Sequence, residues 1–256
     1  MIHPRAEVDP QARLESGVRV EAFAVIGAGV EIGEGSWVGS HAVIRGPTRI
    51  GRRNRIFQFS SVGEEPQDKK FRGEHSRLEI GDGNTIREFV TINRGTDGGG
   101  GVTRIGDDNW IMAYCHIAHD CLIGSHTVFA NNASLAGHVE VADHVILGGF
   151  SLVHQFCRLG RNCFLAFGAH VDRDVPPFVM AAGQRATPRG INVEGLRRHG
   201  FEPTQVQAVK EAFRLLYRSG LRLEDARQRL AAQSEAHPEV ADMLGFLDGS
   251  RRGIIR

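Results

Sequence analysis

The sequence is poor in aromatic residues, which make up 7% of its 256 residues, and it contains only four cysteines. So few cysteines in a chain of this length argue against a fold built on disulfides. The formal net charge of +1 argues against nucleic acid as the main ligand, because domains that bind it are usually strongly basic. No apolar run approaches the roughly 20 residues of a membrane span. The first residues, MIHPRAEVDP, lack the regions of a signal peptide, so we expect a cytoplasmic protein.

What the sequence does contain is a repeat of six residues. An aliphatic residue recurs at every sixth position in the ranges 2–62, 80–92 and 105–171, with Phe129 as the single exception among 26 positions. A small or β-branched residue follows four positions after the aliphatic residue, and glycine often follows the aliphatic residue directly. We interpret each hexapeptide as a short strand and a turn, with the aliphatic and the small residue facing inward. Glycine would relieve the corner where the backbone is crowded or needs unusual dihedral angles.

Two segments interrupt this rhythm. Residues 63–79 and 93–104 are polar, charged and rich in glycine, and we expect them to form loops outside the repeat. Insertions of this kind usually lie on the binding face of a repeat protein. The run Gly98–Gly101 is not a phosphate-binding P-loop, because the Lys-Ser/Thr pair and the helix that should follow it are missing.

The repeat ends after Val171, and the last quarter of the chain has helical patterning. Glu202-Pro203 should begin one helix, Leu223 lies in a second, and Pro238 should begin a third. We expect a repeat domain over 1–189 and a helical domain over 190–256. The helical domain should cap the repeat, since a bare final coil would expose its strand edges.

This pattern resembles the hexapeptide-repeat acyltransferases. The resemblance implies a left-handed parallel β-helix with three hexapeptides, or 18 residues, in each triangular coil. General rules for parallel strand connections would predict the opposite hand, so the handedness comes from the family. The expected fold is mainly β: a left-handed parallel β-helix of hexapeptide repeats, eight to nine coils long, with a C-terminal α-helical domain.

The four cysteines fit the repeat rather than a reactive site. All of them fall at the small inward position, four residues after an aliphatic residue: Cys115, Cys121, Cys157 and Cys163. We expect them to be buried fillers of the core. A zinc site or a cysteine nucleophile is therefore disfavoured.

The histidines are placed differently. Positions 117, 135 and 153 are one coil apart, so the polar residues around them should share one edge of the prism and point outward: His116, His119, Asp120, Gly137, His138, His154 and Gln155. Histidines on three consecutive coils of one edge indicate a shared functional site, which a lone surface histidine would not.

Two chemistries suit this edge. His116, His119 and Asp120 could be metal ligands, although a parallel solenoid gives poor convergence within one chain. Alternatively, His119 and Asp120 form a base with an orienting carboxylate, and a histidine titrates in the right range to take a hydroxyl proton at neutral pH. His126 and His144 also lie one coil apart, but without a matching loop, and we interpret them as surface residues.

A closer similarity runs almost from end to end of the chain. The sequence is similar to the UDP-N-acetylglucosamine O-acyltransferase family in eight stretches: QDKKFRGE (67–74), TINRGT (91–96), HIAHDC (116–121), NNASLAGHV (131–139), VHQF (153–156), DVPPFV (174–179), ATPRGINVEGLRR (186–198) and RGIIR (252–256). A related family that N-acylates the glucosamine begins with a separate uridine-binding domain. This chain enters the repeat at Ile2, which makes that assignment weaker.

The resemblance implies direct transfer of a 3-hydroxyacyl group from acyl carrier protein to the 3-hydroxyl of UDP-N-acetylglucosamine, the first step of lipid A biosynthesis. By resemblance, His119 is the general base, Asp120 orients it, and the backbone N–H of Gly137 stabilises the oxyanion of the thioester. The residue pattern agrees with direct transfer, because a covalent acyl-enzyme would need an outward Cys or Ser beside the base.

The resemblance also assigns binding residues and an assembly. The sugar, the diphosphate and the acyl pantetheine would be held by Asp68, Lys70, His116, His138, His154 and Gln155. Nucleotide contacts would come from Asn192, Glu194 and Arg198. The family works as a homotrimer with each site between two subunits, and no cofactor or metal is implied.

Two residues depart from the family pattern. His199 stands where the family more usually has a second Arg, which puts that nucleotide contact in question. Phe167 stands where some relatives have Gly in the groove that measures acyl length, so we expect a shorter acyl chain here. The alternative is that Phe167 packs against a neighbouring prism.

Two questions stay open at the level of sequence. Basic residues that could dock the acidic carrier protein are Arg189, Arg197, Arg198 and Arg218, although an ordinary solvated face explains them equally well. The chain could also act on another sugar nucleotide, such as one with a 3-amino group, or be a catalytically silent scaffold or metal binder.

Overall fold

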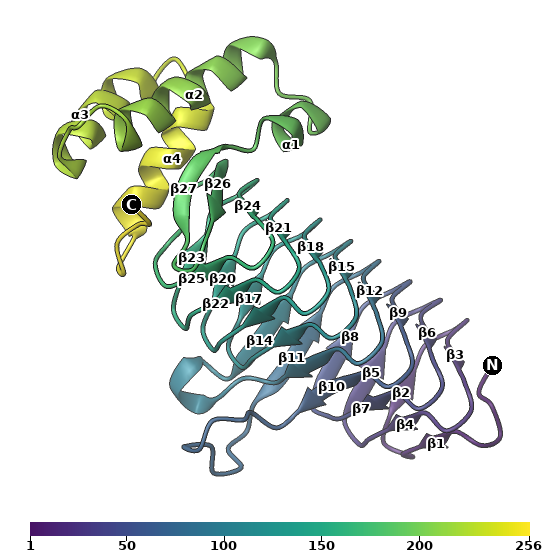
Figure 1. Cartoon of the computed structure of the whole chain (residues 1–256). Coiled ribbons are helices and arrows are strands. Elements are labelled where there is room, and N and C mark those ends of the chain that lie inside the picture. The colour runs from purple at the N-terminus through teal and green to yellow at the C-terminus, as the bar shows by residue number, and fades with distance from the viewer.

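The computed structural model describes all 256 residues and shows a three-sided prism of short strands, followed by four α-helices at one end (Figure 1). Successive strands turn around the prism, and up to β25 (His170–Val171) every third strand joins the same sheet. Each strand therefore pairs with strands one coil earlier and one coil later. We call the three sheets face 1, face 2 and face 3, in the order in which the chain enters them.

Faces 1 and 2 consist only of parallel strands. Face 1 contains β1 (Glu7–Val8), β4 (Val25–Ile26), β7 (Val43–Ile44), β10 (Ser61–Glu64), β13 (Thr91–Asn93), β16 (His116–Ile117), β19 (Ser134–Leu135), β22 (Leu152–Val153) and β25 (His170–Val171). Face 2 contains β2 (Arg13–Leu14), β5 (Val30–Ile32), β8 (Thr48–Ile50), β11 (Arg77–Ile80), β14 (Val102–Ile105), β17 (Leu122–Ile123), β20 (Glu140–Val141) and β23 (Arg158–Leu159).

Face 3 is parallel except at its C-terminal edge, where β26 and β27 form an antiparallel pair. Its strands are β3 (Arg19–Val20), β6 (Trp37–Val38), β9 (Arg55–Ile56), β12 (Thr85–Ile86), β15 (Trp110–Ile111), β18 (Val128–Phe129), β21 (Ile146–Leu147), β24 (Phe164–Leu165), β26 (Val179–Ala182) and β27 (Thr187–Ile191).

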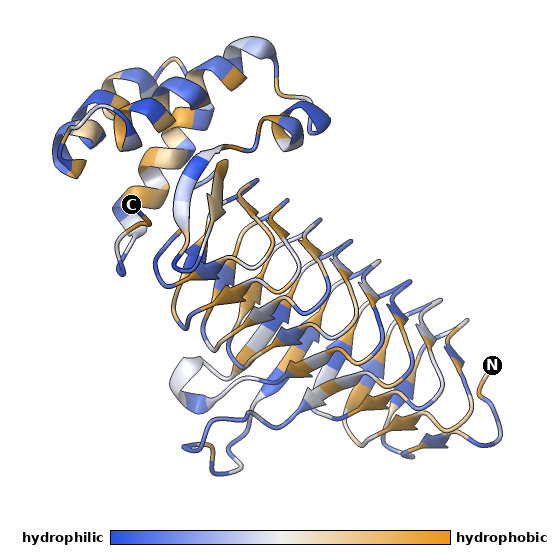
Figure 2. Cartoon of the chain, in the orientation of Figure 1, coloured by the Kyte–Doolittle hydropathy of each residue, from blue (hydrophilic) through white to orange (hydrophobic).

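The repeat aliphatics form the interior of the prism. From Val20 to Val171 every one of them is buried, and Phe129 is buried in the same way. Figure 2 shows hydrophobic segments on the strands of coil after coil. Only the first coil is open: Ile2 is 50% exposed, because no earlier coil covers it. The inward assignment of the six-residue frame is confirmed.

Of the two reasons expected for glycine at the corners, the structure supports crowding for the glycines that directly follow the aliphatic residue. Sixteen non-glycine residues have positive φ, and all of them lie three positions after an inward hydrophobic residue, as His138 does with φ of 61°. The glycines that directly follow the aliphatic residue instead allow neighbouring coils to approach each other. A Cβ atom on Gly33 would lie 2.6 Å from the carbonyl carbon of Gly51. Crowding, and not an unusual dihedral angle, therefore explains glycine at that position.

Both insertions leave the prism from the same corner, between face 1 and face 2. The first covers residues 65–76 between β10 and β11, and the second covers 94–101 between β13 and β14. The second contains a short 3₁₀ helix, η1 (Asp97–Gly99). The predicted ranges 63–79 and 93–104 were too wide, because β10, β11, β13 and β14 extend into them. The loops themselves are confirmed.

The C-terminal end is capped. The three predicted helices are present as α2 (Pro203–Tyr217), α3 (Leu223–Ser234) and α4 (Pro238–Gly249). The sequence did not predict α1 (Val193–Arg198) or the β26–β27 pair. The expected domain boundary between residues 189 and 190 lies inside β27, and the division into 1–189 and 190–256 stays a proposal.

The chain returns to the last coil after α4. Ile254 and Ile255 are buried, and Ile254 bridges to Asp174 at the end of the prism. The buried carboxylate of Asp174 accepts hydrogen bonds from the hydroxyl of Ser250 at 2.6 Å and from the backbone of Arg158 at 2.9 Å. None of the helices is both long enough and apolar enough to cross a membrane.

Candidate active site

The histidine-rich turns lie at the corner where both insertions leave the prism. We call this region the histidine corner; it consists of the turns 118–121, 136–139 and 154–157 together with the insertions 65–76 and 94–101. Consecutive turns are stacked, since His138 N–H donates to the carbonyl of His119 at 3.0 Å, and Phe156 N–H donates to the carbonyl of Gly137 at 3.2 Å. Polar side chains from three coils therefore form one column.

His119 and Asp120 form a hydrogen-bonded pair. Nδ1 of His119 lies 2.7 Å from Oδ2 of Asp120. A carboxylate only accepts hydrogen bonds, so Nδ1 carries the proton and donates it. The lone pair of the neutral ring is then on Nε2. The His119 side chain is 14% exposed, which leaves this nitrogen accessible from outside.

Asp120 points out of the prism, as expected for this edge, but it is not exposed to solvent. Its side chain is 1% exposed because the second insertion folds over it. Thr96 donates to the carboxylate twice, from its backbone N–H at 2.8 Å and from its hydroxyl at 2.6 Å. The backbone N–H of Asp120 donates to the Thr103 hydroxyl at 2.8 Å. Asp120 is a supporting group below the imidazole and not a surface residue.

Gly137 lies directly beneath the imidazole of His119. A Cβ atom at this position would lie 2.6 Å from Cε1 and 2.7 Å from Nε2 of that ring, so any side chain here would displace the imidazole. The N–H of Gly137 donates no hydrogen bond within the chain. A free backbone donor therefore lies beside the nitrogen that can act as a base.

His138 is the second imidazole of the corner. Its Nε2 lies 3.7 Å from Oδ2 of Asp120, its ring meets that of His119 edge to face at 5.1 Å, and it stacks on Phe156 at 4.4 Å. Burial lowers the pKa of His138 and outweighs the negative charges of Asp120 and Asp68. His138 is therefore predominantly neutral at pH 7.

His116 lies on β16, directly before the turn that contains His119. Its Nδ1 lies 2.7 Å from the Thr91 hydroxyl on β13. Burial is the main cause of the lowered pKa of His116, and the nearby His119 adds to it. His116 therefore also favours its neutral form, which suits a hydrogen-bonding role toward a ligand.

The remaining predicted residues of this corner are open to solvent. His154, Gln155 and Lys70 are exposed, and Asp68 is partly buried. His154 borders a cavity of about 560 Å³ on face 1, whose other polar lining includes His170, Arg173, Arg185 and Arg252. These residues are present at the corner, but no contact in the single chain fixes their side chains toward His119.

The corner offers three possible metal ligands. His119, Asp120 and His138 have donor atoms that all lie within 4.8 Å of one another. This set differs from the predicted alternative, which included His116 in place of His138. Both oxygens of Asp120 already accept hydrogen bonds from Thr96, and Oδ2 also accepts from His119. The carboxylate is thus arranged to support an imidazole.

The cysteines are buried and free, as the sequence predicts. Burial raises the pKa of Cys115, Cys121 and Cys157 to about 12, and raises that of Cys163 further. A thiol with so high a pKa is a poor nucleophile at neutral pH. No cysteine is therefore available as an acyl acceptor at this corner.

The predicted nucleotide residues lie at a different corner, between face 2 and face 3. Asn192 caps α1 by accepting a hydrogen bond from Gly195 N–H, and its amide donates to the carbonyl of Asn162 at 3.0 Å. Glu194 and Arg198 are exposed on α1 and pair with each other at 3.2 Å. The structure does not bring these residues to His119 within one chain.

His199 is engaged with the prism. Its Nδ1 hydrogen-bonds to the side chain of Asn162, and its ring lies 4.3 Å from that of His144. His144 in turn stacks on His126 at 5.1 Å. The two histidines that looked like simple surface residues therefore form a column with His199, and this column joins α1 to the β-helix.

Phe167 lies at the third corner, between face 3 and face 1. It is 76% exposed, and its ring meets Phe150 edge to face at 5.8 Å. An exposed phenyl ring of this kind is available to a ligand or to a neighbouring molecule. The four candidate docking residues Arg189, Arg197, Arg198 and Arg218 are all exposed as well.

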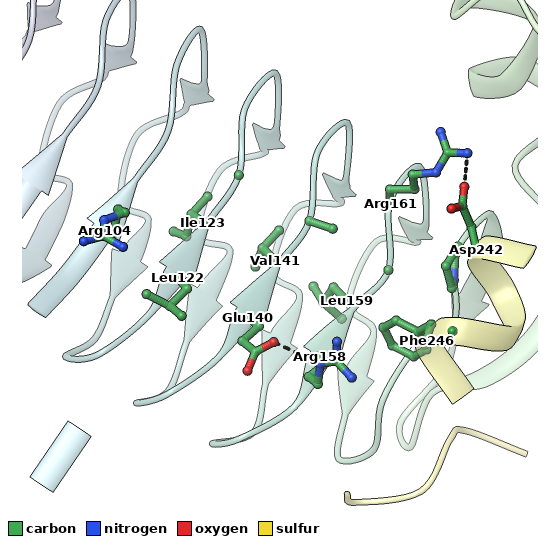
Figure 3. Close-up of a pocket in the computed structure, with 15 residues that line it drawn as sticks. Arg104, Leu122, Ile123, Glu140, Val141, Arg158, Leu159, Arg161, Asp242 and Phe246 are labelled. Carbon is green, nitrogen blue, oxygen red and sulfur yellow. Dashed lines mark hydrogen bonds and ion pairs between the residues drawn. The ribbon is translucent and has the colours of Figure 1, made fainter. Parts of the chain in front are cut away.

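A separate groove of about 510 Å³ lies on face 2, between the prism and α4 (Figure 3). Its arginines are paired with acids: Arg158 with Glu140 at 2.9 Å, and Arg161 with Asp242. Phe246 from α4 packs under Arg158. Because its charges are neutralised internally, this groove lacks the chemistry of the histidine corner.

Sequence reasoning missed the residues that hold the corner in place. Thr96, Thr103 and Thr91 bond to Asp120 or His116, and Phe156 stacks on His138. Thr91, Thr96 and Phe156 lie in stretches that match the family, TINRGT and VHQF, but those matches carried no role for them. Gly99 of the second insertion was interpreted only as one residue of a glycine-rich loop.

Two family models match the chain. One is described as Udp N-acetylglucosamine O-acyltransferase, domain 2, and matches residues 174–255. The other is the bacterial transferase hexapeptide model of six repeats, which matches residues 103–137. The second match agrees with the repeat that includes the histidine corner.

Similar proteins cover the whole chain. The acyl-[acyl-carrier-protein]--UDP-N-acetylglucosamine O-acyltransferase of Halorhodospira halophila is 60% identical and covers 100% of this chain and 99% of its own. The protein of the same name from Thiobacillus denitrificans is 57% identical, over 80% of this chain and 79% of its own.

Solved structures agree with these relatives. The structure of LpxA from Acinetobacter baumannii has a TM-score of 0.97 and 43% identity, covering 100% of this chain and 99% of the other. The UDP-N-acetylglucosamine acyltransferase of Francisella novicida has a TM-score of 0.98 and 42% identity, covering 100% and 94%. The predicted fold, a left-handed parallel β-helix with C-terminal helices, is confirmed.

Proposed function

The chain belongs to the family of UDP-N-acetylglucosamine O-acyltransferases, and from this membership we propose the reaction that its histidine corner performs. The enzyme is an acyltransferase. In our proposal it transfers a 3-hydroxyacyl group from acyl carrier protein to the 3-hydroxyl of UDP-N-acetylglucosamine, which is the first step of lipid A biosynthesis. The products are the 3-O-acylated sugar nucleotide and free carrier protein.

The proposed mechanism is direct attack on the thioester. Nε2 of His119 removes the proton of the sugar 3-hydroxyl while that oxygen bonds to the thioester carbonyl carbon. The negative charge that develops on the carbonyl oxygen is stabilised by the free N–H of Gly137. The carbon–sulfur bond then breaks, and the protonated imidazole returns the proton to the departing thiolate.

Asp120 supports this sequence of steps. It holds the proton of His119 on Nδ1, so that Nε2 presents its lone pair, and it stabilises the imidazolium that forms during attack. The observation that carries the proposal is the stacking of this pair directly over Gly137. One base and one oxyanion donor thus lie side by side, at the corner where both insertions leave the prism.

The cysteines favour direct transfer over a covalent acyl-enzyme. A two-step route needs an accessible nucleophile beside the base. Cys121 is adjacent to Asp120 in sequence, yet it faces the core and its pKa is raised to about 12 by burial. The acceptor hydroxyl is therefore the nucleophile in our proposal.

We assign substrate binding to residues from more than one subunit. The base lies between faces 1 and 2, the nucleotide residues Asn192, Glu194 and Arg198 lie between faces 2 and 3, and Phe167 lies between faces 3 and 1. Three corners of one prism cannot meet. A homotrimer solves this, because a cyclic arrangement can bring different corners of adjacent copies together.

Within such a shared site, Asp68, Lys70, His116, His138, His154 and Gln155 would bind the sugar, the diphosphate and the acyl pantetheine. His116 and His138 are suited to hydrogen bonding because burial favours their neutral forms. The exposed arginines Arg189, Arg197, Arg198 and Arg218 stay candidates for docking the acidic carrier protein.

The reaction is tested by assay of the purified enzyme with UDP-N-acetylglucosamine and a series of 3-hydroxyacyl carrier proteins. We expect a 3-O-acyl product and free carrier thiol in equal amounts. An analogue of the sugar nucleotide with a 3-amino group, supplied in the same assay, tests whether the enzyme acylates an amine in place of the 3-hydroxyl. Absence of transfer to the 3-hydroxyl, with transfer to the amine, would replace the proposal with that alternative.

The shared site is tested by mixing two inactive variants. His119→Ala and Arg198→Ala chains, co-expressed and purified together, should form mixed trimers in which some sites have both native residues. Restored transfer activity supports a site between subunits. A monomeric enzyme, or mixed trimers as inactive as their parents, would contradict it.

A further inference from the structure

The second insertion makes a tight cover over the carboxylate of Asp120. Thr96 donates from its backbone to Oδ1 at 2.8 Å and from its hydroxyl to Oδ2 at 2.6 Å. Both residues are buried, with Thr96 6% and Asp120 5% exposed. A Cβ atom on Gly99 would lie 2.0 Å from the carboxyl carbon of Asp120, so the loop can close this far only with glycine there.

One oxygen of this carboxylate links the cover to the base. Oδ2 accepts from the Thr96 hydroxyl and from Nδ1 of His119, at 2.6 and 2.7 Å. The backbone of Asp120 is fixed separately by the Thr103 hydroxyl. With three donors around it and water excluded, the carboxylate has one orientation, and hydrogen bonds in such a dry site are stronger than in water.

We propose that Thr96 is a positioning residue for acyl transfer, which acts through Asp120 to aim the imidazole of His119. The inference rests on the proposed function, in which His119 is the base. Thr96 does not touch substrate. Its hydroxyl fixes the plane of the carboxylate, and the carboxylate fixes the direction of the Nδ1–H bond and hence of the Nε2 lone pair.

The test compares Thr96→Val, which keeps the shape and the backbone donor, with Thr96→Ser, which restores the hydroxyl. We expect Thr96→Val to lower kcat by about tenfold or more, with both KM values changed less than twofold. Thr96→Ser should recover most of kcat.

Thr127→Val is the matched control. Thr127 is also a fully buried corner threonine, and its hydroxyl donates to Asn109 at 2.6 Å, away from the histidine corner. Thr127→Val should lower the thermal midpoint as Thr96→Val does, but it should leave kcat unchanged. Equal kcat values for the two Val variants would overturn the proposal. If wild type itself transfers no acyl group, the proposed function fails instead, which the same assay shows.

Discussion

The imidazole of His119 rests on the backbone of Gly137, one coil further along the prism. There is no room for a side chain between them, since a Cβ atom on Gly137 would lie 2.6 Å from Cε1 of the ring. The contact places a base and a free N–H donor side by side. It depends on the six-residue repeat, which stacks the two turns at one corner.

Gly137→Ala should therefore impair catalysis through geometry alone. The added methyl group must push the His119 ring away from its position, and a misplacement of this size costs about 100-fold in rate. We expect kcat to fall by about that factor while the protein stays folded. Gly98→Ala is the control, because a Cβ atom there meets nothing within 4 Å. Equal kcat values for the two alanine variants would contradict the close contact.

The cysteines should be inert in the folded enzyme. At pH 8 a thiol with a pKa of about 12 is almost entirely protonated, and burial also blocks access. We expect no reaction with a thiol-specific disulfide reagent in the native state, full transfer activity after that treatment, and four reactive thiols after denaturation. Rapid labelling with loss of activity would instead point to a cysteine at the acyl-transfer site.

Phe167 should limit the length of the acyl chain. In the proposed shared site its exposed ring fills space that Gly would leave open. We expect Phe167→Gly to shift the preference of the purified enzyme toward longer 3-hydroxyacyl carrier proteins, with little change in thermal midpoint. An unchanged preference, together with a weakened trimer on size exclusion, would instead assign Phe167 to packing between subunits.

The histidine column between the prism and α1 should make stability depend on pH. Burial lowers the pKa of His144, with His199 and His126 adding to it, and burial also lowers the pKa of His199. The unfolded chain therefore binds more protons than the folded one below about pH 6.5, and the free energy of unfolding falls as the pH drops through this range.

This dependence can be measured by urea unfolding between pH 7.5 and 5. His144→Asn removes one group of the column, and Asn tolerates the left-handed backbone at this corner, where φ is 59°. We expect the variant to lose less stability on acidification than wild type does. The same pH slope in both proteins would show that the column does not control it.

The sequence predicts the parts of this molecule that repeat. The period of six correctly separated the buried Cys121 from the polar His119 within one short stretch, and it placed His119 and Gly137 in the same column. It could do so because each coil imposes the same inward and outward positions on every residue. Handedness is the exception, since it came from family resemblance and not from the period.

The parts that do not repeat were harder to predict. Thr96 reaches Asp120 across 24 residues, through a loop whose path the period does not describe. For this reason the sequence did not predict that the carboxylate of Asp120 is buried. The short helix α1 and the β26–β27 pair were missed because each is too short to show a pattern, and His199 contacts Asn162 only through the tertiary fold.

The most direct test of the account is kcat/KM for acyl transfer to UDP-N-acetylglucosamine by His119→Asn, measured beside His126→Asn. Both changes replace a corner imidazole with the same smaller polar group, but only His119 is bonded to Asp120 above Gly137. We predict a loss of about 10²- to 10⁴-fold for His119→Asn and near-normal activity for His126→Asn, with both proteins folded. Near-wild-type transfer by His119→Asn would contradict the assignment of the base and, with it, the histidine corner as the active site.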